Sequence, residues 1–158
     1  MDEIGMTIFI NSNYGHDKVI GKSITGLIGF LGGTSITWFA KRQLSVMTST
    51  FSTEFTSLKK AVEEAVAYRY YCRAFGMRMI YPTTIYEDNM SIVLNTSDLD
   101  SNLNQKSMAL SYHFCHEHIA NSIVEVRHVN TKENLLDALT KGLESLDHHN
   151  CFMSFMSN

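Results

Sequence analysis

Two neighbouring carboxylates are the first candidates for chemistry in this sequence. Glu87 and Asp88 lie in the stretch TIYEDNMSIVLN, residues 84–95, where a strand-like pattern changes into a helix-like one. In α/β proteins, the carboxyl end of a strand beside a helix start is a frequent position for functional groups. The alternative is structural, because an Asp before a helix is also a common N-cap. The pair alone therefore indicates a site without defining it.

A third carboxylate, Glu54, lies near the start of the longest predicted helix. Residues 49–76 carry an apolar stripe at helical spacing, with candidate caps at the start and Gly76 at the end. Glu54 sits beside that stripe and away from the charged face, which holds Lys59, Lys60, Glu63 and Glu64. A carboxylate that points inward needs a partner or a metal ion. The alternative is a first-turn Glu that the helix dipole favours.

The elements that position these acids follow from the periodicity. The sequence predicts three strands, a long helix, a strand, two helices, a strand and a helix. The first three strands form an antiparallel meander, because Gly32 and Gly33 can make a tight hairpin between two apolar runs. The strands are expected within residues 6–15, 24–31, 35–40, 83–88 and 123–129, and the helices within 49–76, 89–94, 106–122 and 131–142. Thr131 is the expected cap of the last helix, and Gly142 its C-cap.

The composition indicates one soluble intracellular domain. The 158 residues are enough for a core without disulfides or metal, and no apolar stretch has membrane-spanning length. The formal net charge of −3 is not that of a protein that binds nucleic acid by electrostatics alone. Cys72, Cys115 and Cys151 are scattered without CxxC spacing, so we expect plain thiols and neither a zinc site nor a disulfide framework.

Several blocks of this sequence together resemble a known family. They are GKSITGLIGFLGGTSITWFAKRQ, STEF on the long helix, YEDNMSIVL after a strand, LSYHFCHEHI on a helix, and VNTKENLLDALTKGL. Their order and spacing resemble the ribonuclease H domain of copia-type LTR retrotransposon Pol polyproteins, from about Phe9 to Leu143. The resemblance implies the RNase H-like α/β fold, a five-stranded mixed sheet flanked by helices. It assigns residues 1–143 to the domain and leaves 144–158 as a C-terminal tail.

The resemblance also implies a site for two Mg²⁺ ions, with Mn²⁺ as a substitute. Two such ions about 4 Å apart can activate water and stabilise the leaving oxygen in phosphodiester cleavage, and Mg²⁺ prefers oxygen ligands. Three of the family's four acidic positions are acidic here: Glu54, Asp88 and Asp137. Glu87 is then expected to be an exposed neighbour. Taken singly, Asp88 could be a cap and Asp137 a solvated helical residue.

The sequence departs from the family in the first strand. Asn11 stands where the family carries the Asp that bridges both metal ions. Asn13 replaces a second acid of the motif, and Asp17, the nearest remaining acid, is expected in the turn beyond the strand. A neutral carbonyl cannot bridge two cations as strongly as a carboxylate, so the resemblance implies weak or absent cleavage. Three explanations stay open: decay or repurposing of the natural element, a deliberate Asp-to-Asn change, or a rearranged but active site.

The remaining expectations concern recognition. An RNA/DNA hybrid would be recognised through shape, 2′-hydroxyls and phosphates, and Lys22, Ser23, Thr50 and Asn89 are the candidate contacts, with turn, cap and surface roles as alternatives. His128 lies where the wider ribonuclease H class often keeps a histidine that assists catalysis. The alternative is that His128 is a histidine that packs within the fold or lies on the surface.

Two functions from different classes follow. The first is an endonuclease that cuts the RNA strand of RNA/DNA hybrids with two Mg²⁺ ions. The second is a non-catalytic module that binds hybrid or contacts the reverse transcriptase and integrase portions of the parent polyprotein. Either would act in the cytoplasm, or within virus-like particles. Tyr68, Tyr70 and Tyr71 are candidates for a contact surface, with helix packing as the alternative.

Overall fold

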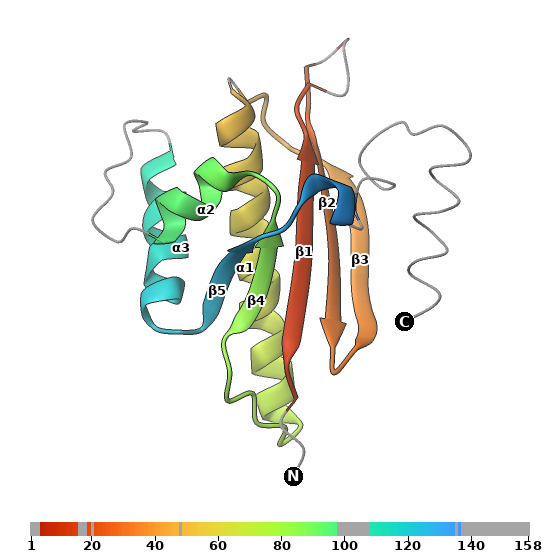
Figure 1. Ribbon diagram of the computed structural model, residues 1–158, viewed down its shortest axis with the longest axis vertical. Coiled ribbons are helices and arrows are strands. Elements are labelled where there is room, and N and C mark those ends of the chain that lie inside the picture. The colour runs from red at the N-terminus through yellow and green to blue at the C-terminus, as the bar shows by residue number, and fades with distance from the viewer. Residues whose placement is uncertain are drawn as a thin grey trace.

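The chain is built on a five-stranded mixed sheet with the strand order β3-β2-β1-β4-β5 (Figure 1). The computed structural model describes residues 4–15, 19, 21–47, 49–97, 108–134 and 136. The strands are β1 Met6–Asn13, β2 Ile24–Leu31, β3 Thr34–Arg42, β4 Thr83–Glu87 and β5 Val124–His128. β1, β2 and β3 are antiparallel, whereas β4 pairs parallel with β1 and β5 pairs parallel with β4. This sheet confirms the predicted fold class.

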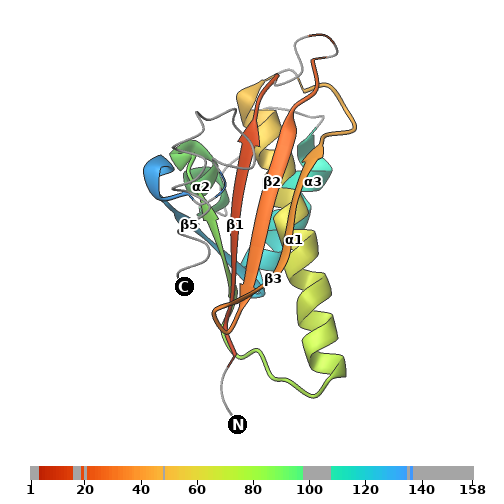
Figure 2. The same ribbon diagram turned by 90° about the vertical axis from the view of Figure 1, so that its right-hand side faces the viewer.

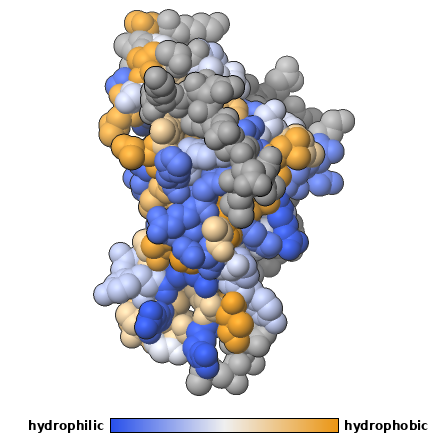
Figure 3. All heavy atoms as spheres, turned by 90° about the vertical axis from the view of Figure 1, so that its left-hand side faces the viewer, coloured by the Kyte–Doolittle hydropathy of each residue, from blue (hydrophilic) through white to orange (hydrophobic). Residues whose placement is uncertain are grey.

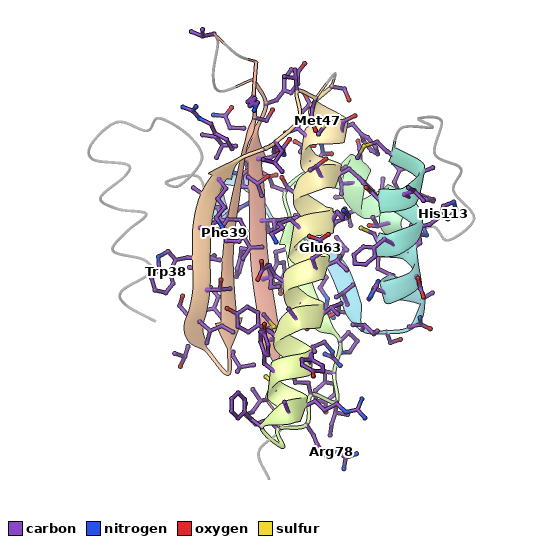
Figure 4. The ribbon with its side chains drawn as sticks, turned by 180° about the vertical axis from the view of Figure 1, so that it is seen from behind. Trp38, Phe39, Met47, Glu63, Arg78 and His113 are labelled. Atoms are coloured by element: carbon purple, nitrogen blue, oxygen red, sulfur yellow. The ribbon has the colours of Figure 1, made fainter. Side chains whose placement is uncertain are left out.

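Helices cover the sheet mainly from one side. They are α1 Thr50–Ala74, α2 Met90–Ser97, α3 Ala109–Ala120 and the short 3₁₀ helix η2 Thr131–Glu133. α1 runs along one face of the sheet and α3 lies beside it (Figures 2 and 4). Within the described residues, no helix is both long and apolar enough to cross a membrane.

α1 begins and ends where the sequence predicts. The Ser49 hydroxyl accepts a hydrogen bond from the Ser52 backbone N–H at 3.1 Å, as an N-cap does. At the other end, Gly76 has a φ of 76°, a conformation that glycine adopts without strain. The 25 residues between these ends are continuous helix. This fixed start determines where Glu54 can point.

The core joins the inward face of β1 to the apolar stripe of α1. Met6, Ile8 and Ile10 alternate inward and meet a buried stripe that includes Phe55 and Leu58. Burial of each such large apolar side chain stabilises the fold by about 1.5–3 kcal/mol. Because this packing fixes the rotation of α1, it also sets the direction of residues beside the stripe.

The predicted last helix differs from the structure at its start. Residues 131–133 form the 3₁₀ helix η2, not the first α-helical turn. Thr131 is the first residue of this 3₁₀ helix, so the prediction that it is the cap of an α-helix was wrong. The Asn134 side-chain oxygen accepts a hydrogen bond from the Leu136 backbone N–H at 3.2 Å, which closes a local turn after η2. The predicted C-cap, Gly142, lies outside the described residues.

Candidate functional site

Three carboxylates approach one another at the end of β4. Glu87 is the last residue of β4, Asp88 follows it, and Glu54 comes from the second turn of α1. Asn89 links the two elements, since its side-chain amide donates to Glu54 Oε2 and its backbone N–H donates to Glu87 Oε1 at 3.1 Å. The Asn89 side-chain oxygen also accepts from the Ser91 backbone N–H at 2.8 Å. Asn89 thereby holds the start of α1 against the end of β4.

Burial and mutual repulsion disfavour the ionised forms of Glu54 and Glu87. Burial raises the pKa of Glu54; the hydrogen bond from Asn89 opposes this rise, and the charge of Asp88 adds to it. The pKa of Glu87 is raised well above its usual range, first by burial and then by the charges of Asp88 and Glu54, against the hydrogen bond from the Asn89 backbone. A cation between such groups would relieve the repulsion.

The expectation that Glu87 is an exposed neighbour was wrong. Its side chain is 1% exposed, and Oε2 has no hydrogen-bond partner among the described residues. The reason is strand alternation: Thr83, Ile85 and Glu87 all point inward from β4. Sequence periodicity could have shown this, because Glu87 lies two residues from the buried Ile85.

Asn11 lies on the strand next to this acid cluster. β1 and β4 are paired in parallel through Phe9 and Tyr86, whose rings stack at 4.9 Å. Asn11 follows Phe9 by two residues, as Asp88 follows Tyr86, so the two continue along the same side of the sheet. Asn11 is 3% exposed, and its side-chain oxygen accepts a hydrogen bond from the Ser12 backbone N–H at 2.8 Å.

Two further residues connect other elements to the same end of the sheet. His128, the last residue of β5, is exposed and has Nε2 at 3.2 Å from the backbone oxygen of Asp88. Asn134 is buried and donates to the backbone oxygen of Ile10 at 3.0 Å. In Figure 1 the blue segment after β5 accordingly passes across β1. Asp137, the remaining predicted acid, lies outside the described residues.

The sequence is similar to parts of transposon polyproteins. It is 27% identical over 140 residues to the retrovirus-related Pol polyprotein from transposon RE1 of Arabidopsis thaliana, covering 89% of this chain and 10% of that protein. It is 29% identical over 128 residues to the Pol polyprotein from transposon RE2 of the same plant, covering 81% of this chain and 9% of that protein. This chain thus spans about a tenth of the length of these relatives. No family model matches.

The solved structures with a similar fold include ribonucleases H. LC11-RNase H1, isolated from compost and solved in complex with an RNA/DNA hybrid, superposes with a TM-score of 0.62 at 10% identity, covering 82% of this chain and 88% of that one. RNase H1 from Halobacterium salinarum NRC-1 superposes with a TM-score of 0.57 at 13% identity, and it covers the same shares of the two chains. The foamy viral protease-reverse transcriptase in complex with RNA/DNA hybrid superposes with a TM-score of 0.59 at 12% identity, covering 94% of this chain and 20% of that one.

This chain has the RNase H-like fold, and its sequence is similar to parts of transposon Pol polyproteins. Both parts of the predicted resemblance are confirmed: the relatives are Pol polyproteins of transposons, and the structural neighbours are ribonucleases H.

The RNase H-like domain places the four predicted substrate contacts in different environments. Ser23 is fully buried, and its hydroxyl accepts from the Gly15 backbone N–H at 3.1 Å and lies 3.3 Å from Thr53 Oγ1. This burial argues against a direct contact between Ser23 and a substrate. Thr50, the first residue of α1, is exposed, and Lys22 is half-buried. Asn89 is half-buried, and its side chain already binds Glu54.

Sequence reasoning missed one residue that supports the RNase H-like domain near Glu54. Gln43 follows β3, is 6% exposed, and donates to the backbone oxygen of Thr53 at 2.9 Å and to Thr25 Oγ1 at 3.0 Å. It therefore fixes the first turns of α1 against β2. A Gln after an edge strand carries no sequence signal that distinguishes it from a surface residue.

The donor chemistry of the RNase H-like domain fits a hard divalent cation. Glu54 and Asp88 offer carboxylate oxygens, and Asn11 a neutral carbonyl oxygen. Within the described ranges, no three His, Cys, Asp or Glu side chains are grouped to hold a metal ion. Among the described residues, Glu54 and Asp88 thus provide two carboxylates and not a complete set of metal ligands.

Proposed function

We propose that this domain is a ribonuclease H that by descent cuts the RNA strand of RNA/DNA hybrids, with activity weakened or abolished by Asn11. The observation that carries the proposal is the approach of Glu54 and Asp88 at the end of β4, beside Asn11 on β1. These residues come from three elements, in an arrangement that suits phosphodiester chemistry. The domain would act as part of a Pol polyprotein, in the cytoplasm or within virus-like particles.

Glu54, Asp88 and Asp137 are the residues that would hold two Mg²⁺ ions, or Mn²⁺ in their place. When bound, such ions activate water and stabilise the leaving oxygen. Asn89 would orient the Glu54 carboxylate through its side-chain hydrogen bond. His128, beside the Asp88 backbone, would stand next to the site at the sheet edge.

Substrate recognition would use polar groups near the start of α1. A hybrid is recognised through its shape, its 2′-hydroxyls and its phosphates more than through its bases. Thr50 at the exposed first turn and Lys22 before β2 are suited to such contacts. Asn89 could contact substrate only while it also holds Glu54.

The test is cleavage of a labelled RNA/DNA hybrid by this chain and by Asn11→Asp, side by side in Mg²⁺ and in Mn²⁺. Restoring the carboxylate should raise the cleavage rate by roughly a hundredfold or more, because the site would then offer one more carboxylate to hold the cations. Asn11→Asp combined with Asp88→Asn is the control, and it should lose the gain. No cleavage by Asn11→Asp would contradict the nuclease proposal.

A second candidate function is a non-catalytic module that binds hybrid, or that contacts the reverse transcriptase and integrase portions of a polyprotein. The neutral Asn11, already hydrogen-bonded to the Ser12 backbone, favours it. It predicts hybrid binding of similar strength with Asn or Asp at position 11 and cleavage with neither, measured by fluorescence anisotropy and gel assay on the same hybrid.

A further inference from the structure

A groove of about 630 Å³ lies at the C-terminal end of α1, remote from the carboxylates. Its walls are the last turns of α1, residues 77–80 and Ile123. Arg73 follows Glu54 by 19 residues in the same helix, which corresponds to roughly 28 Å along the helix axis. In Figure 4, Met47 marks the end of the molecule near the start of α1 and Arg78 marks the opposite end. The groove is therefore separate from the proposed nuclease site.

Arg69 holds the groove in shape. Its guanidinium donates to the backbone oxygen of Tyr81 at 2.8 Å and to that of Met79 at 3.0 Å. These bonds hold the segment between α1 and β4 against the helix, so the groove exists before any partner binds. Burial lowers the pKa of Arg69, but an Arg keeps its charge at neutral pH.

The groove is basic in a chain whose formal net charge is −3. Residues 65–86 contain three arginines, Arg69, Arg73 and Arg78, and neither Asp nor Glu. Arg73 and Arg78 line the groove and are exposed. Neither guanidinium forms a recorded hydrogen bond or ion pair with the described residues, unlike Lys59 and Lys60, which pair with Glu63 and Glu64 on the same helix. Two positive charges are thus left for an external partner.

The same groove offers apolar surface. Val66, Met77, Met79 and Ile123 are half-buried along it, and Ile80 is 58% exposed at its edge. Tyr70, on the rim, is 69% exposed. Figure 3 shows strongly hydrophilic and hydrophobic side chains together at the lower end of the molecule, where α1 ends. Tyr70 and its neighbour Tyr71, at 53% exposure, agree with the predicted contact surface, whereas Tyr68 packs against the core.

We infer that this groove binds an acidic protein segment that carries a large apolar side chain. The apolar floor takes that side chain, and Arg73 and Arg78 bind carboxylates on either side of it. Arg is suited to this role because its planar guanidinium matches a carboxylate in two hydrogen bonds. An RNA/DNA hybrid fits less well, because a nucleic-acid backbone needs a track of cations and gains little from an apolar cavity. The inference does not depend on whether the domain cleaves hybrid.

The test uses a fluorescein-labelled peptide of twelve residues with one central Leu flanked by Glu and Asp, and the same peptide with Gln and Asn in their place. Anisotropy titrations compare this chain with the double variant Arg73→Gln/Arg78→Gln. The matched control is Lys59→Gln/Lys60→Gln, which also removes two positive charges, in this case from α1 outside the groove. Two further variants test the apolar floor. Ile80→Ser changes the groove, and Leu110→Ser is its control, because Leu110 is 88% exposed on α3 outside the groove.

We expect the acidic peptide to bind this chain and the lysine control alike, and to bind the arginine variant roughly tenfold or more weakly. The neutral peptide should bind at least tenfold more weakly than the acidic one, and Ile80→Ser should weaken binding where Leu110→Ser does not. The melting temperature of every variant should stay within a few degrees of that of the unchanged chain, because none of these side chains is buried. Three results would overturn the inference. They are an equal loss of peptide affinity in the arginine and lysine double variants, no binding of the acidic peptide, and displacement of the peptide by a short RNA/DNA hybrid.

Discussion

Asn11 and Glu87 change the number of carboxyl groups at the site in opposite directions. Asn11 removes the carboxylate that the family places on β1, while Glu87 adds a buried carboxyl at the end of β4. Oε2 of Glu87 has no hydrogen-bond partner among the described residues, and a buried unpaired acceptor costs about 1–3 kcal/mol. Burial of this carboxyl accordingly raises the pKa of Glu87 well above its usual range.

The pH dependence of stability should reveal Glu87. The folded chain holds the Glu87 proton to a higher pH than the unfolded chain, whose Glu titrates near 4.5. Its contribution to the free energy of unfolding is therefore full below pH 4.5 and is lost as the pH rises through the raised pKa. We expect the free energy of unfolding of the unchanged chain to fall from pH 5 to pH 8. In Glu87→Gln this fall should be smaller by about 1–3 kcal/mol.

Urea unfolding in EDTA at several pH values measures this effect. Glu63→Gln is the control, because Glu63 is only half-buried on α1 and, among the described residues, forms ion pairs with Lys59 and Lys60. The pH slope of the Glu63→Gln variant should match that of the unchanged chain. A Glu87→Gln variant with an unchanged slope would show that Glu87 does not carry the proton.

At the level of elements, single polar side chains join the segments that carry the site. Asn89 joins α1 to the end of β4, and Gln43 joins the end of β3 to α1. Asn134 joins the segment after η2 to β1, since it donates to Ile10 and accepts from Leu136. The residues next to these contacts, Asn11 and Asp137, are two of the four predicted site positions. Asn134 is thus a candidate positioning residue for the proposed site.

Asn134→Ala should lower the free energy of unfolding by about 1–3 kcal/mol, because it removes two hydrogen bonds of a buried side chain. In the Asn11→Asp background it should also lower the cleavage rate at saturating hybrid more than it changes hybrid affinity, since Asn134 joins the segment after η2 to β1 beside the proposed site. Denaturant unfolding and steady-state cleavage measure the two effects. Asn121→Ala, at the exposed end of α3, is the control and should change neither by much.

At the scale of the whole molecule, α1 separates two surfaces of opposite chemistry. Its first turns carry Glu54 toward the acidic end of β4, and its last turns carry Arg73 toward the basic groove. The sheet order brings β1, β4 and β5 together at the acidic end, because parallel strands that lie side by side end on the same edge. Stabilisation of the fold by a cation should therefore depend on the carboxylates at the acidic end and not on the arginines of the groove.

Divalent cations should raise the melting temperature by binding the folded state alone. Mn²⁺ at millimolar concentration should raise it by a few degrees in Asn11→Asp and by less in the unchanged chain, which has one carboxylate fewer. Asp88→Asn should abolish the shift, whereas Arg73→Gln/Arg78→Gln should leave it intact. Differential scanning fluorimetry with Mn²⁺ and EDTA measures this. An equal shift in Asp88→Asn would place the cation elsewhere.

The periodicity of the sequence was enough to determine the elements and the order of the sheet's first half. The hairpin at Gly32 and Gly33 follows from two glycines with positive φ, and α1 follows from its cap, its stripe and Gly76. These features are local, so they depend on residues near in sequence. The family blocks added the candidate acids, of which Glu54 and Asp88 lie together and Asp137 is outside the described residues.

The tertiary structure alone decided which polar groups are buried and what they bind. Glu87 is buried, the Ser23 hydroxyl lies against Thr53 of α1, and Asn134 is buried and donates to β1. The physical reason is that each of these depends on a contact between segments far apart in the chain, such as Asn134 with Ile10 across 124 residues. Local patterns fix backbone conformation, whereas packing between distant elements fixes burial and hydrogen-bond partners.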